Sequence, residues 1–259
     1  MSDSGQQMPP PPPPNLSPPP GYAAYQPTAA GSVPLLRVQK LRTALVVLLI
    51  VVAVGNALVL ATVPSQVDTA EELLAGTIDD DTFNERQLPS AFAQLLVGAA
   101  TIAVIVLSII WLFRIVKNHR TLGRRGTWGP GWAIGGWFLP PLLYVIPTLL
   151  LREHWKASDP DAPVGDERWR SSGEPALVYV WFVLYSVIPV GLAIAGSSAF
   201  FRGFNPDPQD LAEGIVDTQG VTIASAIFAV LGAVAWLLVV RALTARHVAL
   251  TGEIANARR

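Results

Sequence analysis

The sequence predicts an all-α membrane protein with four transmembrane helices, a proline-broken apolar segment that is re-entrant or interfacial, and a disordered proline-rich N-terminal tail. Its 259 residues are 51% hydrophobic and 14% charged, whereas soluble proteins average about 25% charged residues. Four apolar stretches each approach the roughly 20 residues that a helix needs to cross a bilayer. With these four spans, 16 of the 18 Lys and Arg residues fall on one side of the membrane, as expected for cytoplasmic loops and termini.

The N-terminal region, residues 1–36, is predicted to be a disordered cytoplasmic tail. Residues 1–34 hold eleven prolines, including the run Pro9 to Pro14, in place of the basic and apolar regions of a cleavable signal peptide. Such a segment samples polyproline II and cannot bury apolar surface. We expect a solvated leader; a docking peptide for a protein partner is the alternative.

The membrane domain is predicted over residues 37–250, and a short basic C-terminal tail follows at 251–259. The four spans contain no Asp, Glu, Lys, Arg or His, and they cover about residues 43–63, 91–113, 176–200 and 221–240. The loops after the first and third spans are acidic, and they hold only two of the 18 basic residues, Arg86 and Arg202.

A fifth apolar segment, residues 131–151, is long enough to cross the membrane but is predicted not to do so. If it crossed, the 18 Lys and Arg residues would divide 9:9 between the two sides; if it does not, they divide 16:2. Cytoplasmic loops carry the excess of Lys and Arg, so the second topology is favoured, with both termini in the cytoplasm. Pro140 and Pro141 also interrupt a helix near the middle of the segment. Its halves fit a dip to mid-membrane or a position flat at the interface, and we favour the dip.

The stretch from Trp111 to Pro160 reads WLFRIVKNHRTLGRRGTWGPGWAIGGWFLPPLLYVIPTLLLREHWKASDP. It has a tryptophan at a helix end, a basic stretch with Asn and Leu-Gly, then Pro-Gly-Trp-Ala and Trp-Phe-x-Pro, and finally a Pro, an acidic residue and Trp-x-Ala-Ser. These elements fall on Trp111, Asn118, Leu122, Gly123, Pro130, Gly131, Trp132, Ala133, Trp137, Phe138, Pro140, Pro147, Glu153, Trp155, Ala157 and Ser158. In this pattern the chain resembles a family of actinobacterial membrane proteins known as domain of unknown function 4328.

The resemblance covers residues 40 to 250 and includes the segment VVRALTARH, residues 239–247, which looks like the family's last helix end. It implies four helices and a prokaryotic plasma membrane, without an assigned activity. Eight positions of the pattern are candidate structural or interaction residues: Trp111, Asn118, Trp132, Trp137, Pro140, Pro147, Glu153 and Trp155. The chain departs from the pattern at four positions, where the family more often has Asn, an aromatic residue or Gln: Leu142, Leu143, Thr148 and Leu149.

The spans lack ionisable residues, which argues against an ion-coupled pump because such proteins use intramembrane charges. No catalytic triad or nucleotide fingerprint is present, and we predict no enzyme, cofactor or metal. The histidines His119, His154 and His247 lie at the predicted cytoplasmic ends of apolar segments. They could meet around a metal with Glu153 as a fourth ligand, but they lack the close helical spacing of a metal motif. We expect interfacial histidines without a ligand.

Two polar residues inside the spans, Asn56 and Gln94, are predicted to make interhelical hydrogen bonds; contact with a ligand is the alternative. A basic cluster on the predicted cytoplasmic side either sets the topology or binds anionic lipid headgroups. Its candidate headgroup contacts are Arg120, Arg124, Arg125, Arg152 and Lys156.

The sequence thus predicts a multi-pass plasma-membrane protein of unknown activity, and a non-enzymatic protein that contacts partners or lipid is the favoured function. The alternative is a channel or transporter for a neutral or lipid-like substrate, built around residues 131–151. The net charge of −1 provides no attraction to nucleic acid. Expected partners are the bilayer, with anionic headgroups and a protein bound to the tail as further candidates. Small residues spaced four apart would serve packing within one chain or homo-oligomerisation equally well.

Overall fold

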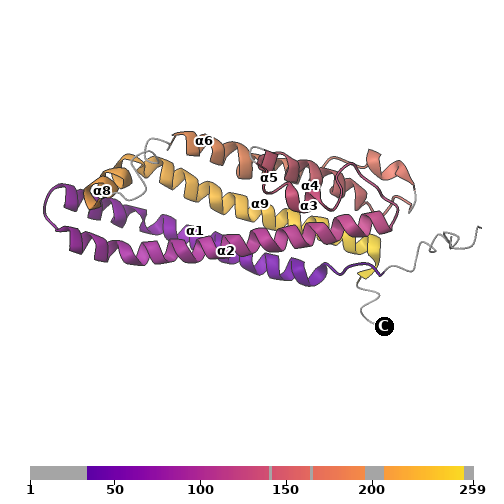
Figure 1. Ribbon diagram of the computed structural model, residues 1–259, viewed down its shortest axis with the longest axis horizontal. Coiled ribbons are helices and arrows are strands. Elements are labelled where there is room, and N and C mark those ends of the chain that lie inside the picture. Colours follow the sequence, from indigo (N-terminus) through magenta and orange to yellow (C-terminus); the bar gives the residue numbers. More distant parts are fainter. Residues whose placement is uncertain (1–33, 140–141, 164–165, 196–206, 254–259) are drawn as a thin grey trace, which may run out of the picture. The chain divides into compact units, whose positions relative to one another are not determined.

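The computed structural model describes residues 34–139, 142–163, 166–195 and 207–253. Residues 35–259 form one compact unit (Figure 1). All regular structure in the described residues is helical. The predictions for the proline-rich tail, for Pro140 and Pro141 and for most of the C-terminal tail fall outside the described residues.

Four helical segments are long and apolar enough to span a membrane, which confirms the predicted fold class. They are α1 (Gln39–Leu74), α2 (Asp80–Thr121), the consecutive α5 (Ala176–Phe182), η3 (Val183–Val187) and α6 (Ile188–Ala195), and α9 (Gln219–Thr251). The helices extend beyond the apolar stretches of the sequence. Helix α1, for example, continues through Pro64 because its last turns bury Ala70 and Leu73.

A short helix that the sequence did not predict, α8 (Pro208–Asp217), lies in the acidic loop before α9. The Asp207 carboxylate caps it by accepting a hydrogen bond from the main-chain N–H of Asp210 at 2.8 Å. Helix α8 buries Ala212 against Ala70, Leu73 and Phe83, and together they form a second, smaller core. The loop thereby covers one end of the bundle, which we call the acidic end.

The broken apolar segment does not form a fifth spanning helix. It folds as α3 (Trp132–Gly135), the 3₁₀ turn η1 (Leu142–Tyr144) and α4 (Ile146–Ala157), and a further 3₁₀ turn, η2 (Glu167–Ser171), follows. Pro147 stands in the first turn of α4, where the missing N–H costs no helical hydrogen bond. A Cβ at Gly136 would lie 2.5 Å from Ile146 Cγ2 and 2.8 Å from the Trp132 carbonyl oxygen, so only glycine lets the two halves approach this closely.

The bundle is built on α1, which packs along both α2 and α9 (Figure 1). Side chains, and not close backbone contact, bridge the groove between α2 and α9. We call the end of the bundle that holds Asn118 and Arg124 the basic end. The side-chain bridges of the described residues lie towards this end. At the acidic end, α8 covers the groove. This groove is the feature that positions the candidate sites.

Candidate functional site

Side-chain hydrogen bonds join α2 to α9 at three successive levels of the basic end. Asn118 Nδ2 lies 3.0 Å from His247 Nε2. Towards the acidic end, Trp111 Nε1 donates to Thr244 Oγ1 at 3.0 Å, and Trp236 Nε1 donates to Ser108 Oγ at 3.0 Å. All six side chains are buried, so each bond also satisfies polar groups that would otherwise be costly in an apolar core. The groove is therefore closed from the Asn118 level to the Ser108 level.

Four aromatic rings form a layer at the last of these bridges. The Trp181 ring centroid lies 4.6 Å from that of Trp236 and 4.7 Å from that of Tyr185. Trp137 comes from the broken segment. Its ring centroid lies 6.3 Å from those of Tyr185 and Trp236 and 6.5 Å from that of Trp181. The broken segment therefore packs into the bundle, because Trp137 contacts residues of the third span and of α9. The buried Trp137 Nε1 donor has no partner among the described residues.

An apolar pocket of about 300 Å³, which we call the aromatic pocket, lies directly beyond this layer. Its lining residues are Leu49, Val52, Asn56, Val97, Thr101, Val104, Ile105, Ser108, Trp137, Trp181, Leu184, Tyr185, Pro189, Phe228, Ala229, Gly232, Ala233 and Trp236. They include no Asp, Glu, Lys, Arg or His. This volume and lining are typical of sites for small apolar molecules, which are concave, rich in aromatic residues and have few polar groups.

The wall formed by the third span has an irregular backbone. Its central turn, η3, is π-helical, and Leu184 and Tyr185 from this turn line the pocket. Pro189 lies four residues after Tyr185 and has no N–H to donate to the Tyr185 carbonyl, so the regular α-helical hydrogen bond is missing there. The wider turn accommodates that loss, and π turns of this kind occur often at functional sites.

The aromatic pocket lies between α2 and the third span, which contact each other little in the described residues. Instead, α2 packs on α1, and the third span packs on α9. Pro189 and Ile105, one from each wall, are exposed. Both walls belong to helices long and apolar enough to cross a bilayer, and the gap between them opens at the surface of the bundle.

The two intramembrane polar residues singled out in the sequence lie differently from the interhelical bonds expected of them. Asn56 donates to the Val52 carbonyl of its own helix at 2.8 Å and lines the aromatic pocket. Gln94 is exposed and lines a second pocket nearer the acidic end. Both side chains therefore line pockets, and neither makes the expected interhelical hydrogen bond in the described residues.

The three histidines meet in a buried cluster at the basic end. His119 Nδ1 lies 3.0 Å from His154 Nδ1, and His119 Nε2 lies 3.3 Å from His247 Nδ1 and 3.1 Å from Ser158 Oγ. The cluster ties together α2, α4 and α9, and each imidazole is at most 1% exposed. Buried positions replace the interfacial ones that the sequence led us to expect.

The hydrogen bonds of Asn118 determine which nitrogen of each imidazole carries a proton. The Leu36 N–H donates to Asn118 Oδ1 at 2.7 Å, so Nδ2 is the donor to the Leu36 carbonyl and to His247 Nε2. His247 then carries its proton on Nδ1 and donates to His119 Nε2, and His119 donates from Nδ1 to His154 Nδ1. The proton of His154 remains on Nε2, a buried atom that has no side-chain hydrogen-bond partner in the described part of the chain and lies near the main chain of Trp128. All three imidazoles are neutral in this arrangement.

This pattern also bears on metal binding, because the two nitrogens of His119 face different partners and the three rings do not converge on one point. Within the described ranges no group of three or more His, Cys, Asp or Glu side chains is placed to hold a metal. Glu153, the fourth ligand considered, accepts hydrogen bonds from the main-chain N–H groups of Thr127 and Trp128 at 2.8 and 3.0 Å. Burial also lowers the pKa of His154 to about 3, which agrees with the neutral imidazole assigned above.

Arg124 lies differently from the headgroup contact predicted for it. It is 1% exposed, and its guanidinium donates to the carbonyls of Ala157 and Asp159, each at 2.7 Å, and to that of Ala162. It therefore organises the loop after α4 and is unavailable to lipid. Burial lowers the pKa of the Arg124 guanidinium, and the nearby Asp159 carboxylate acts in the opposite direction.

The other four basic candidates divide into two pairs. Arg120 and Arg125 are exposed. Arg152 and Lys156 both contact the Glu174 carboxylate, at 2.6 and 2.5 Å. Hydrogen bonds hold the pKa of Glu174 well below its ordinary value; the bond from Arg152 has the largest effect and that from Lys156 the next largest. These two cations are thus already paired within the protein, which leaves the exposed pair as the freer basic groups.

The remaining family positions have mainly packing contacts. Trp132 is 40% exposed and packs edge-on against Trp128, with ring centroids 5.3 Å apart. The Arg246 guanidinium lies 5.0 Å from the centre of the Trp155 ring, a cation–π contact. Sequence reasoning missed the pocket-lining Trp181, Tyr185 and Trp236, because aromatic residues that line a pocket and those that face lipid look alike within an apolar span.

Four spanning helices around a ligand-sized intramembrane pocket define a multi-pass integral membrane protein. The family described as Domain of unknown function (DUF4328) matches residues 75–245, more than half of the chain, and the protein belongs to that family. This confirms the resemblance seen in the sequence. Comparisons with curated proteins and with solved structures find no match.

Proposed function

We propose that this protein is a non-enzymatic lipid-binding membrane protein, which holds an apolar chain in the aromatic pocket. The observation that carries the proposal is the pocket itself, an apolar cavity of about 300 Å³ that opens between α2 and the third span. A chain from the surrounding bilayer can enter sideways, without passing through water. The absence of Asp, Glu, Lys, Arg and His from the lining favours an uncharged occupant, since a charge at this depth is costly unless it is paired.

Tryptophan fluorescence provides the test, because Trp137, Trp181 and Trp236 line the pocket. The full chain is reconstituted in vesicles of phosphatidylcholine whose acyl chains carry bromine, a short-range quencher. Ala229→Phe fills the pocket with a large side chain and should reduce the quenched fraction. The matched control is Val234→Phe, at a residue that is 44% exposed and outside the lining. Equal quenching of the folded wild type and Ala229→Phe would refute the proposal.

A transport function for a neutral or lipid-like substrate is the second candidate, and the π-helical turn at η3 is the observation that favours it. A turn of this kind can change its hydrogen-bond register and so alter the width of the pocket. Protein-dependent movement of a fluorescent lipid between the two leaflets of the same vesicles would support transport. Lipid binding without such movement would refute transport and would be consistent with lipid binding as the function.

A further inference from the structure

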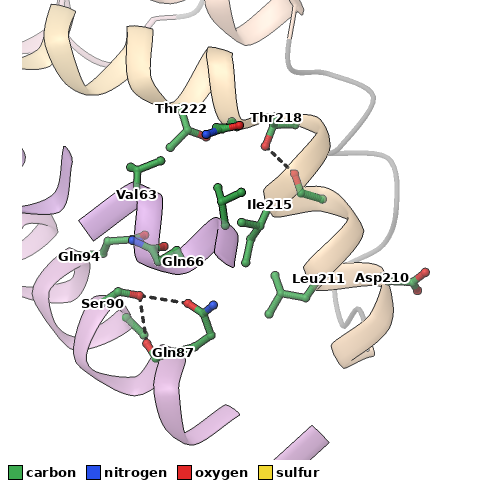
Figure 2. Close-up of a pocket in the computed structure, with 14 residues that line it drawn as sticks. Val63, Gln66, Gln87, Ser90, Gln94, Asp210, Leu211, Ile215, Thr218 and Thr222 are labelled. Carbon is green, nitrogen blue, oxygen red and sulfur yellow. Dashed lines mark hydrogen bonds between the residues drawn. The ribbon is translucent and has the colours of Figure 1, made fainter. Parts of the chain in front are cut away.

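A second pocket, which we call the amide pocket, lies at the acidic end of the α2–α9 groove (Figure 2). Its volume is about 440 Å³, and helices α1, α2, α8 and α9 form its walls. The lining residues are Val63, Gln66, Val67, Gln87, Ser90, Ala91, Gln94, Asp210, Leu211, Gly214, Ile215, Thr218, Gln219 and Thr222. Four of them are glutamines, and three more carry hydroxyl groups.

Part of this hydrogen-bonding capacity is unused within the protein. Ser90 Oγ lies 3.0 Å from the main-chain carbonyl oxygen of Gln87 and 3.4 Å from Gln87 Oε1, so its single proton is directed mainly to the carbonyl. The Gln87 amide nitrogen lies on the side of the amide group away from Ser90 (Figure 2). That nitrogen is buried and has no partner in the described part of the chain. Gln66 Nε2 donates to Thr62 Oγ1 at 2.8 Å, so its carbonyl oxygen remains as an acceptor. The pocket therefore offers donors and acceptors side by side, as hydroxyl groups require.

The charges of the described lining of the amide pocket favour a neutral ligand over an anionic one. No Lys, Arg or His belongs to the lining, and its one ionisable residue is Asp210. The Asp210 side chain points away from the other labelled side chains (Figure 2). Within the described lining, a phosphate here would meet no Lys, Arg or His and would lie near the carboxylate of Asp210, which is unfavourable. The lining fits a neutral molecule instead.

The amide pocket and the aromatic pocket lie in the same groove, since α1, α2 and α9 line both. On α2, the amide pocket ends at Gln94, and the aromatic pocket extends from Val97 to Ser108. At 1.5 Å per residue, the aromatic pocket begins about 4.5 Å and ends about 21 Å from the Gln94 level. One leaflet of a bilayer is about 15 Å deep. A lipid with its headgroup at Gln94 would thus have its chain alongside the aromatic pocket.

We infer that the amide pocket binds the uncharged, hydroxyl-rich headgroup of the lipid whose chain occupies the aromatic pocket. The ligand class is a glycolipid or a similar lipid with a polyhydroxyl headgroup. This inference rests on the proposed lipid-binding function and adds the headgroup to it. The glutamine amides donate to and accept from the headgroup hydroxyls, and Val63, Leu211 and Ile215 cover its apolar faces.

The test compares two lipids with identical brominated chains, one with a glucosyl headgroup and one with phosphatidylglycerol, whose headgroup has hydroxyls and a negative charge. Tryptophan quenching is followed as each lipid is titrated into vesicles that contain the full chain. We expect half-maximal quenching by the glucosyl lipid at a mole fraction about fivefold lower or more, the effect of one or two net hydrogen bonds. The double variant Gln87→Leu/Gln94→Leu should reduce this preference to within about twofold, while quenching by the chains persists.

Two matched variants support the interpretation. Gln209→Leu, on α8 but outside the lining, should retain the wild-type preference. Thr222→Val removes one hydroxyl from the wall with little change of shape and should lower the preference for the glucosyl lipid. It replaces the double variant in the test if the double variant does not fold. In a further arm, methyl glucoside, which has no chain, should not prevent quenching at concentrations equivalent to those of the lipid. Prevention by the free sugar would overturn the lipid as the source of the headgroup.

The two proposals fail in different ways. If Ala229→Phe lowers quenching by both lipids but the wild type does not prefer the glucosyl lipid, the amide pocket is not a headgroup site and lipid binding stands. A preference for phosphatidylglycerol would refute the headgroup inference in the same way. If Ala229→Phe changes nothing for either lipid, the proposed function itself is wrong.

Discussion

Acidification should destabilise this protein through His154, the histidine that ends the hydrogen-bonded chain from Asn118. Burial lowers the pKa of His154 to about 3 from its ordinary value of 6.5. Below pH 6.5 the unfolded chain therefore binds a proton that the folded chain excludes, and the stability falls as the pH falls towards 3. Geometry agrees with this sign, because a proton added to His154 Nδ1 would face the donor at His119 Nδ1, only 3.0 Å away.

The magnitude follows from the linkage between proton binding and folding. Each pKa unit corresponds to about 1.4 kcal/mol, so at about pH 5 the loss of stability from His154 is about 2 kcal/mol relative to neutral pH. For a domain of this size, that lowers the midpoint of thermal unfolding by about 4–8 °C. Side chains that face the cluster from neighbouring elements include His119, His247 and Arg124, and their contributions are removed by comparing variants.

The assay is thermal unfolding of the purified full chain in detergent, followed by tryptophan fluorescence between about pH 7.5 and about pH 5, the range in which the linked protonation occurs. In His154→Gln the side chain cannot titrate but can still accept from His119 Nδ1. Its unfolding midpoint should therefore fall by about 4–8 °C less than that of the wild type over this range. Arg125 is exposed and lies outside the histidine cluster, so Arg125→Gln serves as the control. Its unfolding midpoint should depend on pH in the same way as that of the wild type. If wild type and His154→Gln lose stability equally, His154 is not held neutral in the folded protein and the proton assignments of the cluster are wrong.

Three further predictions concern other parts of the fold. Arg124→Met should lower the free energy of unfolding by about 3 kcal/mol or more, because three carbonyls lose a charged donor, whereas Arg125→Met should change it by no more than about 0.5 kcal/mol in chemical denaturation. Gly136→Ala should destabilise the broken segment by about 1–3 kcal/mol, since the new Cβ overlaps the Trp132 carbonyl and Ile146; unchanged thermal stability would contradict the close packing. Single cysteines at Asp80, Asp161 and Gln209 should report the topology, with an impermeant thiol reagent labelling the first and third from outside intact cells, and labelling at Asp161 would contradict cytoplasmic termini.

The sequence and the structure agree best where one property of the bilayer dominates. A helix must supply about 20 apolar residues to cross, and the 16:2 division of the basic residues leaves one reasonable assignment of residues 131–151. The structure confirms four candidate spans, and the described residues contain no fifth. The lengths of the helices were not predictable in the same way. Polar turns such as those of α1 beyond Pro64 are stabilised by tertiary contacts with α8 and Phe83, which composition does not reveal.

The sequence by itself determined the membrane class, the number of spans, the non-spanning segment and the family, because each depends on local composition or on a short motif. Only the tertiary structure decided that Arg124 faces carbonyls and not lipid, that three histidines distant in the sequence share one buried cluster, and that Trp137 closes a pocket. In an apolar span, a residue that lines a cavity and one that faces lipid have the same hydrophobicity. Their roles separate only when the packing of α2, α9 and the third span shows which faces meet and which remain open.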